Sequence, residues 1–230
     1  METRTGRRSE RVRDDDALPD SVTHDLRSMI IRGSLLPGEH LGQTQLAARF
    51  GRSKVPIREA LKRLAAEGFL RHDRNRGYFV APLEYPEAAQ LYKLRRWVEA
   101  ELLETARWPT VKEVHGFRRQ FDALERIDQT ARFNEWALAL EDLRYAIFDL
   151  SPQKVLLREA TRLWMLTDRY RCFFPRDEEE SPERALIDAL ERRDREKLQQ
   201  DYHGIRDRVE ALLYEVFGSE GEAPRPYMLT

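Results

Sequence analysis

The chain has 230 residues, of which 35% are charged and 41% hydrophobic, with 40 Lys and Arg against 41 Asp and Glu. This length supports one or two folded domains, and the apolar fraction is too high for a disordered chain. No apolar run reaches the roughly 18 residues of a membrane span, and residues 1–20 lack the apolar core of a signal peptide. The single cysteine, Cys172, excludes a disulfide framework and a cysteine-based zinc site. A cytoplasmic protein without a membrane segment is therefore expected.

The charge is distributed unevenly along the chain. The first 82 residues carry 16 Lys and Arg against 11 Asp and Glu, whereas the remainder carries 24 against 30. A basic N-terminal segment joined to an acidic C-terminal segment suggests that the N-terminal segment binds a polyanion. Chance variation in composition explains the difference equally well, so charge alone does not establish that this segment binds nucleic acid.

The front half predicts three short helices. Residues 1–20 are polar and are expected to form a disordered tail. Ser21 is the expected N-cap of a first helix that ends at Gly33. A second helix is expected over 43–50, followed by Gly51, and a third is capped by Ser53 and ends at Gly68. Helical spacing predicts the inward-facing residues Val22, Leu26, Met29, Ile30, Leu46, Ala47, Phe50, Ile57, Ala60, Leu61 and Leu64.

A β-hairpin is predicted directly after the third helix. The segments 69–72 and 78–80 flank a polar, basic tip that contains Gly77. Two helices separated by a tight glycine turn, followed by a hairpin, form a winged helix-turn-helix. We therefore expect a DNA-binding domain over residues 21–82.

The back half reads as helix throughout and predicts an antiparallel bundle over residues 83–218, with a frayed tail over 219–230. The Ser-Pro pairs at 151–152 and 181–182 predict helix starts, and residues 175–180 predict a loop. Two apolar stripes support a bundle, namely Leu91, Leu94, Val98 and Leu102, and Trp136, Leu140, Leu143 and Ile147. The expected helices span 86–106, 110–127, 131–150, 152–174, 182–193 and 195–217. The fold class is thus mostly α, with a small β-hairpin wing.

The third helix carries the residues expected to read DNA. A recognition helix lies in the major groove and meets base edges with its N-terminal turn. Lys54 can donate to guanine, Ser53 to a phosphate or base, and Val55 can contact a thymine methyl group. Arg58 lies one turn further on. A solvated helix face is the alternative for the basic stripe Lys54, Arg58 and Lys62, but the glycine turn and the hairpin favour DNA binding.

The N-terminal residues resemble the DNA-binding domain of the GntR transcription regulators. The likeness lies in residues 35–41, 46–68 and 77–80, in which the run Leu46-Ala47-x-x-Phe50-Gly51-x-Ser53-Lys54-x-Pro56-Ile57-Arg58-Glu59-Ala60-Leu61 is specific. The resemblance implies a bacterial regulator that binds a short palindrome in double-stranded DNA as a homodimer. A basic residue is common at the position of Thr44, so one phosphate contact is expected to be weaker. The DNA-contacting positions implied by the family are Thr44, Ser53, Lys54, Val55, Arg58, Arg74, Asn75, Arg76 and Gly77.

The helical half resembles the FCD effector domain of the FadR-like branch. The likeness lies in residues 94–99, in Asp142-x-x-Tyr145-Ala146 with Ser151, and in residues 183–190 followed by Asp194. Many FCD domains hold a divalent metal with one Asp and three His. Here Asp142 keeps its place, but the three histidine places fall on Ala146, Glu183 and near Ile205. His203 is expected to point elsewhere, because two residues turn a helix by about 200°. We therefore expect no metal of the usual kind; a hard-cation site of Asp142 and Glu183 is the alternative.

Without a metal, an anionic effector needs arginine, whose planar fork binds a carboxylate at two points. The resemblance implies an effector that is a small carboxylate or a sugar acid, as in most of the family, or fatty acyl-CoA as in FadR. Alternatives remain open: Arg95 can pair with Glu99, Arg162 and Arg169 can lie on the surface, and Asp142 can be a buried carboxylate bonded to an arginine. The candidate effector residues are Arg95, Asp142, Tyr145, Arg162, Arg169, Glu183 and Tyr202.

Two other functions are weighed against a ligand-responsive regulator. An all-helical enzyme is disfavoured, because the sequence contains none of the catalytic motifs G-x-S-x-G, P-loop, G-x-G-x-x-G or H-E-x-x-H. A winged helix used only for protein contacts predicts a neutral recognition helix and wing tip. The basic residues Lys54, Arg58, Arg74 and Arg76 argue against it.

Overall fold

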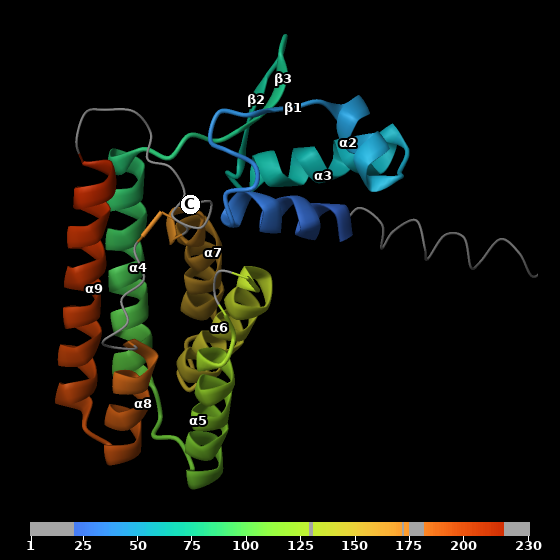
Figure 1. Ribbon diagram of the computed structural model, residues 1–230. Coiled ribbons are helices and arrows are strands. Elements are labelled where there is room, and N and C mark those ends of the chain that lie inside the picture. Colours follow the sequence, from blue (N-terminus) through green and yellow to red (C-terminus); the bar gives the residue numbers. More distant parts are fainter. Residues whose placement is uncertain (1–20, 129–130, 172, 175–181, 219–230) are drawn as a thin grey trace, which may run out of the picture. The chain divides into compact units, whose positions relative to one another are not determined.

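The computed structural model describes residues 21–128, 131–171, 173–174 and 182–218 (Figure 1). The expected tails at 1–20 and 219–230, the loop at 175–180 and the cap residue Ser181 lie outside the described residues. The chain divides into two compact units between Pro82 and Leu83. Each unit has its own core and is described by itself.

The first unit is a set of short helices with a three-stranded antiparallel sheet. The strands run in the order β1-β3-β2, so β3 is central. The hairpin of β2 and β3 was predicted, but β1 was not, and Ser21 lies inside the first helix rather than before it. The elements are a helix over 21–31, β1 (His40–Leu41), α2 (Gln43–Phe50), α3 (Lys54–Ala66), β2 (Leu70–Asp73) and β3 (Gly77–Val80).

The core of this unit is built from the apolar faces that the helical spacing predicts. Leu26, Ile57, Leu61 and Leu64 are completely buried. Gly51 ends α2 with φ of 60°, a left-handed conformation that glycine adopts without strain, and this lets α3 begin three residues later against α2. Ala47 and Phe50, which were also predicted to face inward, are only partly buried.

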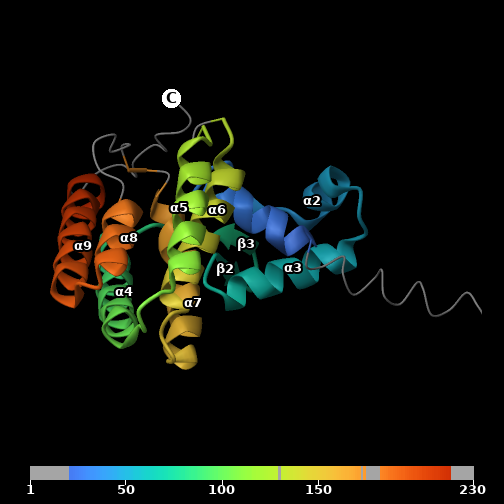
Figure 2. The ribbon, with the colours of Figure 1, turned by 90° about the horizontal axis from the view of Figure 1, so that it is seen from below.

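The second unit is a helical bundle. α4 packs against α7 and α9, α8 packs against α5 and α9, and α5 packs against α6. Figure 2 shows α8 and α9 beside α4, with α5, α6 and α7 grouped together. No helix of the described residues is both long and apolar enough to cross a membrane. The helices are α4 (Tyr85–Thr105), α5 (Val111–Glu125), α6 (Phe133–Phe148), α7 (Lys154–Arg171), α8 (Pro182–Arg192) and α9 (Arg195–Phe217).

Two sequence-based expectations in the bundle are wrong. α7 begins at Lys154 rather than Pro152, because the Ser151 hydroxyl accepts from the Gln153 amide and lies 2.8 Å from the Thr105 hydroxyl. The buried face of α4 is also different from the predicted stripe, since Leu94 is 46% exposed. Polar side chains occupy that face, which consists of Ala88, Tyr92, Arg95, Glu99, Leu102 and Leu103. The stripe on α6, in contrast, is buried as predicted.

Candidate nucleic-acid interface and buried pocket

The N-terminal turn of α3 is presented to solvent. Ser53 occupies the N-cap position without a side-chain capping bond, and Ser53, Lys54 and Arg58 are all exposed. Val55 is 60% exposed although it is apolar. The opposite face of α3 is held in the core, so the exposed face has a fixed orientation within this unit.

The exposed basic stripe of α3 is partly paired. Glu59 Oε1 lies 3.1 Å from Lys62 Nζ and 3.5 Å from Arg58 Nε. The hydrogen bond from Lys62 is the main cause that lowers the pKa of Glu59. Two further arginines, Arg49 and Arg52, are exposed at the turn between α2 and α3. Neither was among the predicted DNA-contacting residues.

The tip of the wing has a defined backbone shape. Asp73 Oδ1 accepts from the amides of Asn75 at 2.8 Å and Arg76 at 3.0 Å, and the first of these bonds is the main cause that lowers the pKa of Asp73. Gly77 follows with φ of 93°, where a side chain would be strained. Arg74, Asn75 and Arg76 are therefore held exposed at the end of the hairpin.

Strand β1 is joined to this tip by His40. The His40 ring lies 5.0 Å from the Phe79 ring, and its Nε2 atom donates to the Arg76 carbonyl at 2.9 Å. The Arg76 guanidinium lies over Phe79, 5.3 Å from the ring centre. The predicted residue Thr44 is also exposed, on α2. His40 was missed because a two-residue strand leaves no periodic signal.

The helical unit contains a small buried pocket between α4, α6, α8 and α9. Its volume is about 20 Å³, which is enough for one small group. Acidic, basic and apolar side chains all line this pocket. The lining residues are Arg95, Glu99, Arg144, Ile147, Phe148, Glu183, Leu186, Tyr202, Ile205 and Arg206.

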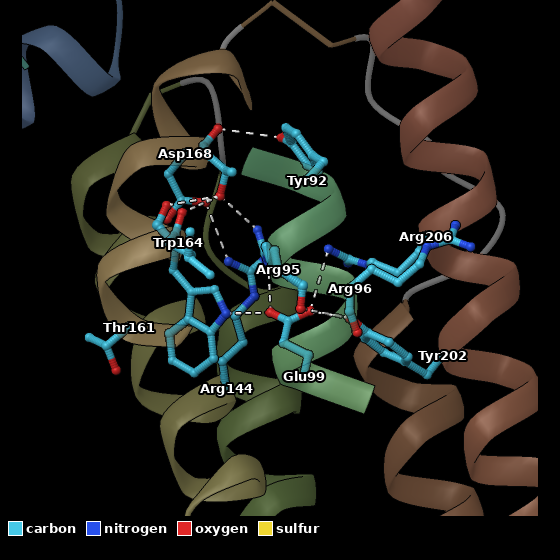
Figure 3. Close-up of polar contacts among 12 residues, drawn as sticks. Tyr92, Arg95, Arg96, Glu99, Arg144, Thr161, Trp164, Asp168, Tyr202 and Arg206 are labelled. Carbon is cyan, nitrogen blue, oxygen red and sulfur yellow. Dashed lines mark hydrogen bonds and ion pairs between the residues drawn. The ribbon is translucent and has the colours of Figure 1, made fainter. Parts of the chain in front are cut away.

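Glu99 is the centre of a buried polar network at this pocket (Figure 3). It accepts from Arg95 Nε at 2.7 Å, from the Tyr202 hydroxyl at 2.7 Å and from Trp164 Nε1. Burial opposes ionisation of Glu99, but Arg95 and Arg206 outweigh it and hold its pKa at about 2. Burial and the charge of Glu99 raise the pKa of Tyr202 well above its ordinary value. Glu99 is thus ionised at neutral pH, and its hydrogen bonds join α4, α7 and α9.

Two lining arginines were missed by the sequence analysis. Arg144 on α6 is 5% exposed and Arg206 on α9 is 8% exposed. Burial is the main cause that lowers the pKa of each, and the positive charge of Arg95 adds to it. Charged residues at helical spacing normally predict a solvated face, so nothing in the pattern marked these two as buried.

The structure brings three of the seven predicted effector residues together. Arg95, Glu183 and Tyr202 line the pocket. Arg95 lines the pocket and also forms an ion pair with Glu99, so both of the roles considered for it in the sequence are compatible with its position. Arg95 also donates to the Thr167 hydroxyl at 2.9 Å, which fixes its guanidinium.

The other four predicted effector residues lie elsewhere. Asp142 and Tyr145 are exposed, because α6 turns Leu143 and Arg144 inward instead; the expectation of a buried Asp142 is wrong. Arg162 is exposed, with its Nη1 atom 3.8 Å from Glu159. Arg169 is buried, against the surface alternative, but it pairs with Glu87 at 3.2 Å and does not line the pocket.

The side chains at the pocket do not suit a divalent metal. Three guanidinium groups line it, and guanidinium has no lone pair to offer a cation. Of its two carboxylates, Glu99 is already bonded to three donors, and Glu183 Oε1 lies 3.7 Å from Arg144 Nε. His203 is exposed, as its helical position predicts, and the described residues contain no group of three or more His, Cys, Asp or Glu that could hold a metal. The alternative site of Asp142 and Glu183 is not formed, because Asp142 is exposed while Glu183 is buried.

A winged helix-turn-helix with an exposed basic helix, followed by a helical unit with an internal pocket, defines the class of two-domain transcription regulators. Residues 18–80 match the model of the bacterial regulatory proteins of the gntR family, and residues 90–203 match the FCD domain. The chain therefore belongs to the GntR family and carries an FCD domain. These are families of regulators and not of enzymes.

Individual relatives agree with this assignment. The chain is 30% identical over 158 residues to the HTH-type transcriptional repressor GlaR of Escherichia coli, covering 66% of this chain and 71% of the repressor. It is 28% identical over 210 residues to the gluconate operon transcriptional repressor of Bacillus subtilis, covering 83% and 84%. The similarity to two other curated regulators spans only 32% and 58% of their lengths. A GntR regulator structure from Rhodococcus has the same fold, with a TM-score of 0.70, 20% identity, and coverage of 86% and 98%.

Proposed function

We propose that this chain is a ligand-responsive transcription regulator that binds a palindromic operator in double-stranded DNA as a homodimer. The observation that carries the proposal is the exposed N-terminal turn of α3. The major groove of DNA admits a helix, and the first residues of that helix meet base edges. Lys54 donates to guanine, Val55 contacts a thymine methyl group, and Arg58 reaches a base or a phosphate. The 60% exposure of apolar Val55 supports a contact that forms only with a partner.

The wing supplies contacts to the DNA backbone. Arg74 and Arg76 are exposed beside Asn75 and Gly77 at the end of a hairpin whose tip is fixed by Asp73. Cationic side chains at such a tip suit phosphates or a narrow minor groove. Ser53 and Thr44 complete the proposed contact surface, with the short Thr44 making a weaker phosphate contact.

Two observations support a dimer: the small area that one winged helix can bury against DNA, and the exposed apolar side chains on α4. A single winged helix buries a small interface, and two copies related by a two-fold axis read a palindrome with higher affinity. Leu94 and Trp97 are 46% and 59% exposed on α4. A second copy of this chain is the proposed cover for these two apolar side chains.

The pocket of the helical unit is the proposed effector site, and the effector is a small organic acid. Effector binding favours one arrangement of the two recognition helices over another and so changes DNA affinity. The relative named for the gluconate operon, whose namesake is a sugar acid, supports this class. We place the regulator in the cytoplasm with the nucleoid, where its operator DNA is found.

A winged helix that contacts only protein is the competing function. It predicts a neutral recognition surface, whereas Lys54, Arg58, Arg74 and Arg76 are all exposed. This set of cations favours a polyanionic partner.

Selection from a pool of random DNA duplexes tests the proposal. The purified chain is expected to enrich a palindrome with two half-sites spaced by one helical turn or a multiple of it. Sedimentation of the selected duplex with the chain is expected to give two chains per duplex. A pool without an enriched palindrome would overturn the proposal.

A further inference from the structure

Arg206 is buried in the pocket without hydrogen-bond partners for two of its nitrogen atoms. It is 8% exposed, and neither Nε nor Nη1 has a partner within hydrogen-bond distance. Its nearest carboxylate oxygen, Glu99 Oε2, lies 3.7 Å from Nη1. Figure 3 shows Arg206 directed from α9 toward Glu99. Buried donors that stay unpaired are costly, so this guanidinium has unused capacity to bind an acceptor inside the pocket.

Arg144 approaches the same pocket from α6 and is also loosely paired. Its Nη1 lies 3.4 Å from Asp168 Oδ1, and its Nε lies 3.7 Å from Glu183 Oε1. Both distances exceed the 2.7–2.9 Å that is usual between a guanidinium and a carboxylate. The geometry leaves room for a closer anionic partner.

Three guanidinium groups and two carboxylates, Glu99 and Glu183, line the pocket, so the lining carries an excess of one positive charge toward an incoming anion. Arg95 lowers the pKa of both Arg144 and Arg206, so the three guanidinium groups repel one another. Glu99 is occupied by Arg95, Tyr202 and Trp164. A bound anion relieves the repulsion between Arg144 and Arg206 without breaking the bonds of Glu99.

We propose that Arg206 and Arg144 together hold the carboxylate of the effector, without a metal ion, and that this carboxylate bridges α9 and α6. This inference rests on the proposed function, because it assigns the ligand class and the binding residues of the same effector site. The volume of about 20 Å³ has room for only a small group, and the planar guanidinium fork binds a carboxylate at two points. Arg95, Glu99 and Tyr202 are positioning residues that fix the walls of the site.

The bridge also gives the ligand a structural effect. α6 packs against α5 and contacts α4, whereas α9 packs against α4 and α8. An anion shared by Arg144 and Arg206 links α6 to α9 through their charged side chains. The ligand thereby favours the arrangement in which both guanidinium groups point inward.

Calorimetric titration of the full chain, in buffer with a chelator and without DNA, tests the inference. The probes are acetate, succinate, citrate and gluconate, with inorganic phosphate as the comparison anion at matched ionic strength. At least one carboxylate is expected to bind more tightly than phosphate. Arg206→Gln is expected to weaken that binding by roughly tenfold to a hundredfold, the effect of losing charge-assisted hydrogen bonds. Arg206→Lys keeps the positive charge but not the planar guanidinium, so it is expected to recover only part of the lost carboxylate affinity.

The exposed Arg158 on α7 provides the matched control, since Arg158→Gln removes one arginine away from the pocket. Circular dichroism checks that each variant is folded, and Arg144→Gln tests the second guanidinium if Arg206→Gln does not fold. The inference is overturned if none of the four carboxylates binds in the buffer with chelator, or if phosphate binds best. It is also overturned if the folded variants bind like the unmodified chain. Because the titration contains no DNA, a negative result rejects only the carboxylate site, whereas a negative DNA selection rejects the proposed function.

Discussion

His40 Nε2 donates a hydrogen bond of 2.9 Å to the carbonyl oxygen of Arg76, and this bond ties the shortest strand of the first unit to the wing tip. A carbonyl can only accept, so the His40 ring must carry its proton on Nε2. The bond holds the backbone of Arg76 next to Gly77. It thereby limits the positions that the Arg76 guanidinium can reach.

We predict that His40→Ala weakens DNA binding through the wing. Loss of one hydrogen bond corresponds to about 0.5–1.5 kcal/mol, a several-fold decrease in affinity for the selected duplex. His40→Gln keeps a donor and is expected to recover part of it. Fluorescence anisotropy measures both, and His24→Ala on the exposed side of the first helix is the control. Equal affinities of His40→Ala and the unmodified chain would rule out a positioning role for His40.

Arg58→Ala is predicted to weaken specific DNA binding by roughly 1–3 kcal/mol, because Arg58 lies one turn after Lys54 on the face of α3 that is proposed to enter the major groove. The ion pair of Arg58 with Glu59 is exposed and long, at 3.5 Å, so its loss is expected to leave the fold intact. A gel shift at fixed salt measures the change, with Arg158→Ala as a control outside this unit. An unchanged shift would remove Arg58 from the DNA contacts.

The sequence predicts the first unit well because its elements obey local rules. Glycine turns, an N-cap position and helical spacing place α2, α3 and the hairpin with their buried residues, such as Ile57 and Leu61. Strand β1 could not be predicted in this way. Its two residues, His40 and Leu41, are too few to form a periodic pattern, and they form a strand only because they pair with β3. His40 was therefore not foreseeable from the sequence.

The pocket could not be predicted from apolar periodicity, since its key residues break that pattern. Arg95 and Glu99 are buried on α4 while Leu94 is exposed, and of the predicted apolar stripe only Leu102 is fully buried. Burial of charge depends on partners from other helices, in this case Trp164 and Tyr202, and such pairing leaves no signal in one sequence. The same holds for Arg144 and Arg206.

We predict that purified protein, prepared without a chelator, contains no stoichiometric zinc, nickel or manganese. The guanidinium groups of Arg95, Arg144 and Arg206 repel a cation at the place where a metal would bind. Elemental analysis of the full chain measures the content directly. One metal ion per chain would show that the pocket takes a ligand set different from the one described.

Glu99→Gln is predicted to destabilise the helical unit by about 3–5 kcal/mol at neutral pH, because it leaves buried arginines without their carboxylate. The pKa of Glu99 is about 2 in the fold against 4.5 ordinarily, so its ionised form stabilises the fold above about pH 4.5. This contribution is lost as the pH falls toward 2. Urea unfolding at pH 7 and pH 3 is therefore expected to give a smaller difference between variant and unmodified chain at the lower pH. A difference independent of pH would mean that the charge of Glu99 is not what stabilises the unit.

The exposed apolar pair on α4 gives a test of the dimer. If a second copy covers Leu94 and Trp97, the double variant Leu94→Glu with Trp97→Glu places four like charges in the interface, and the chain becomes monomeric. Light scattering after size exclusion measures the mass, and Val111→Glu, which changes a 72% exposed residue on α5, is the control. The monomeric variant is expected to keep its helical content but to lose affinity for the full palindrome, since only one recognition helix can then engage at a time. A double variant that stays dimeric would move the interface to another face of the bundle.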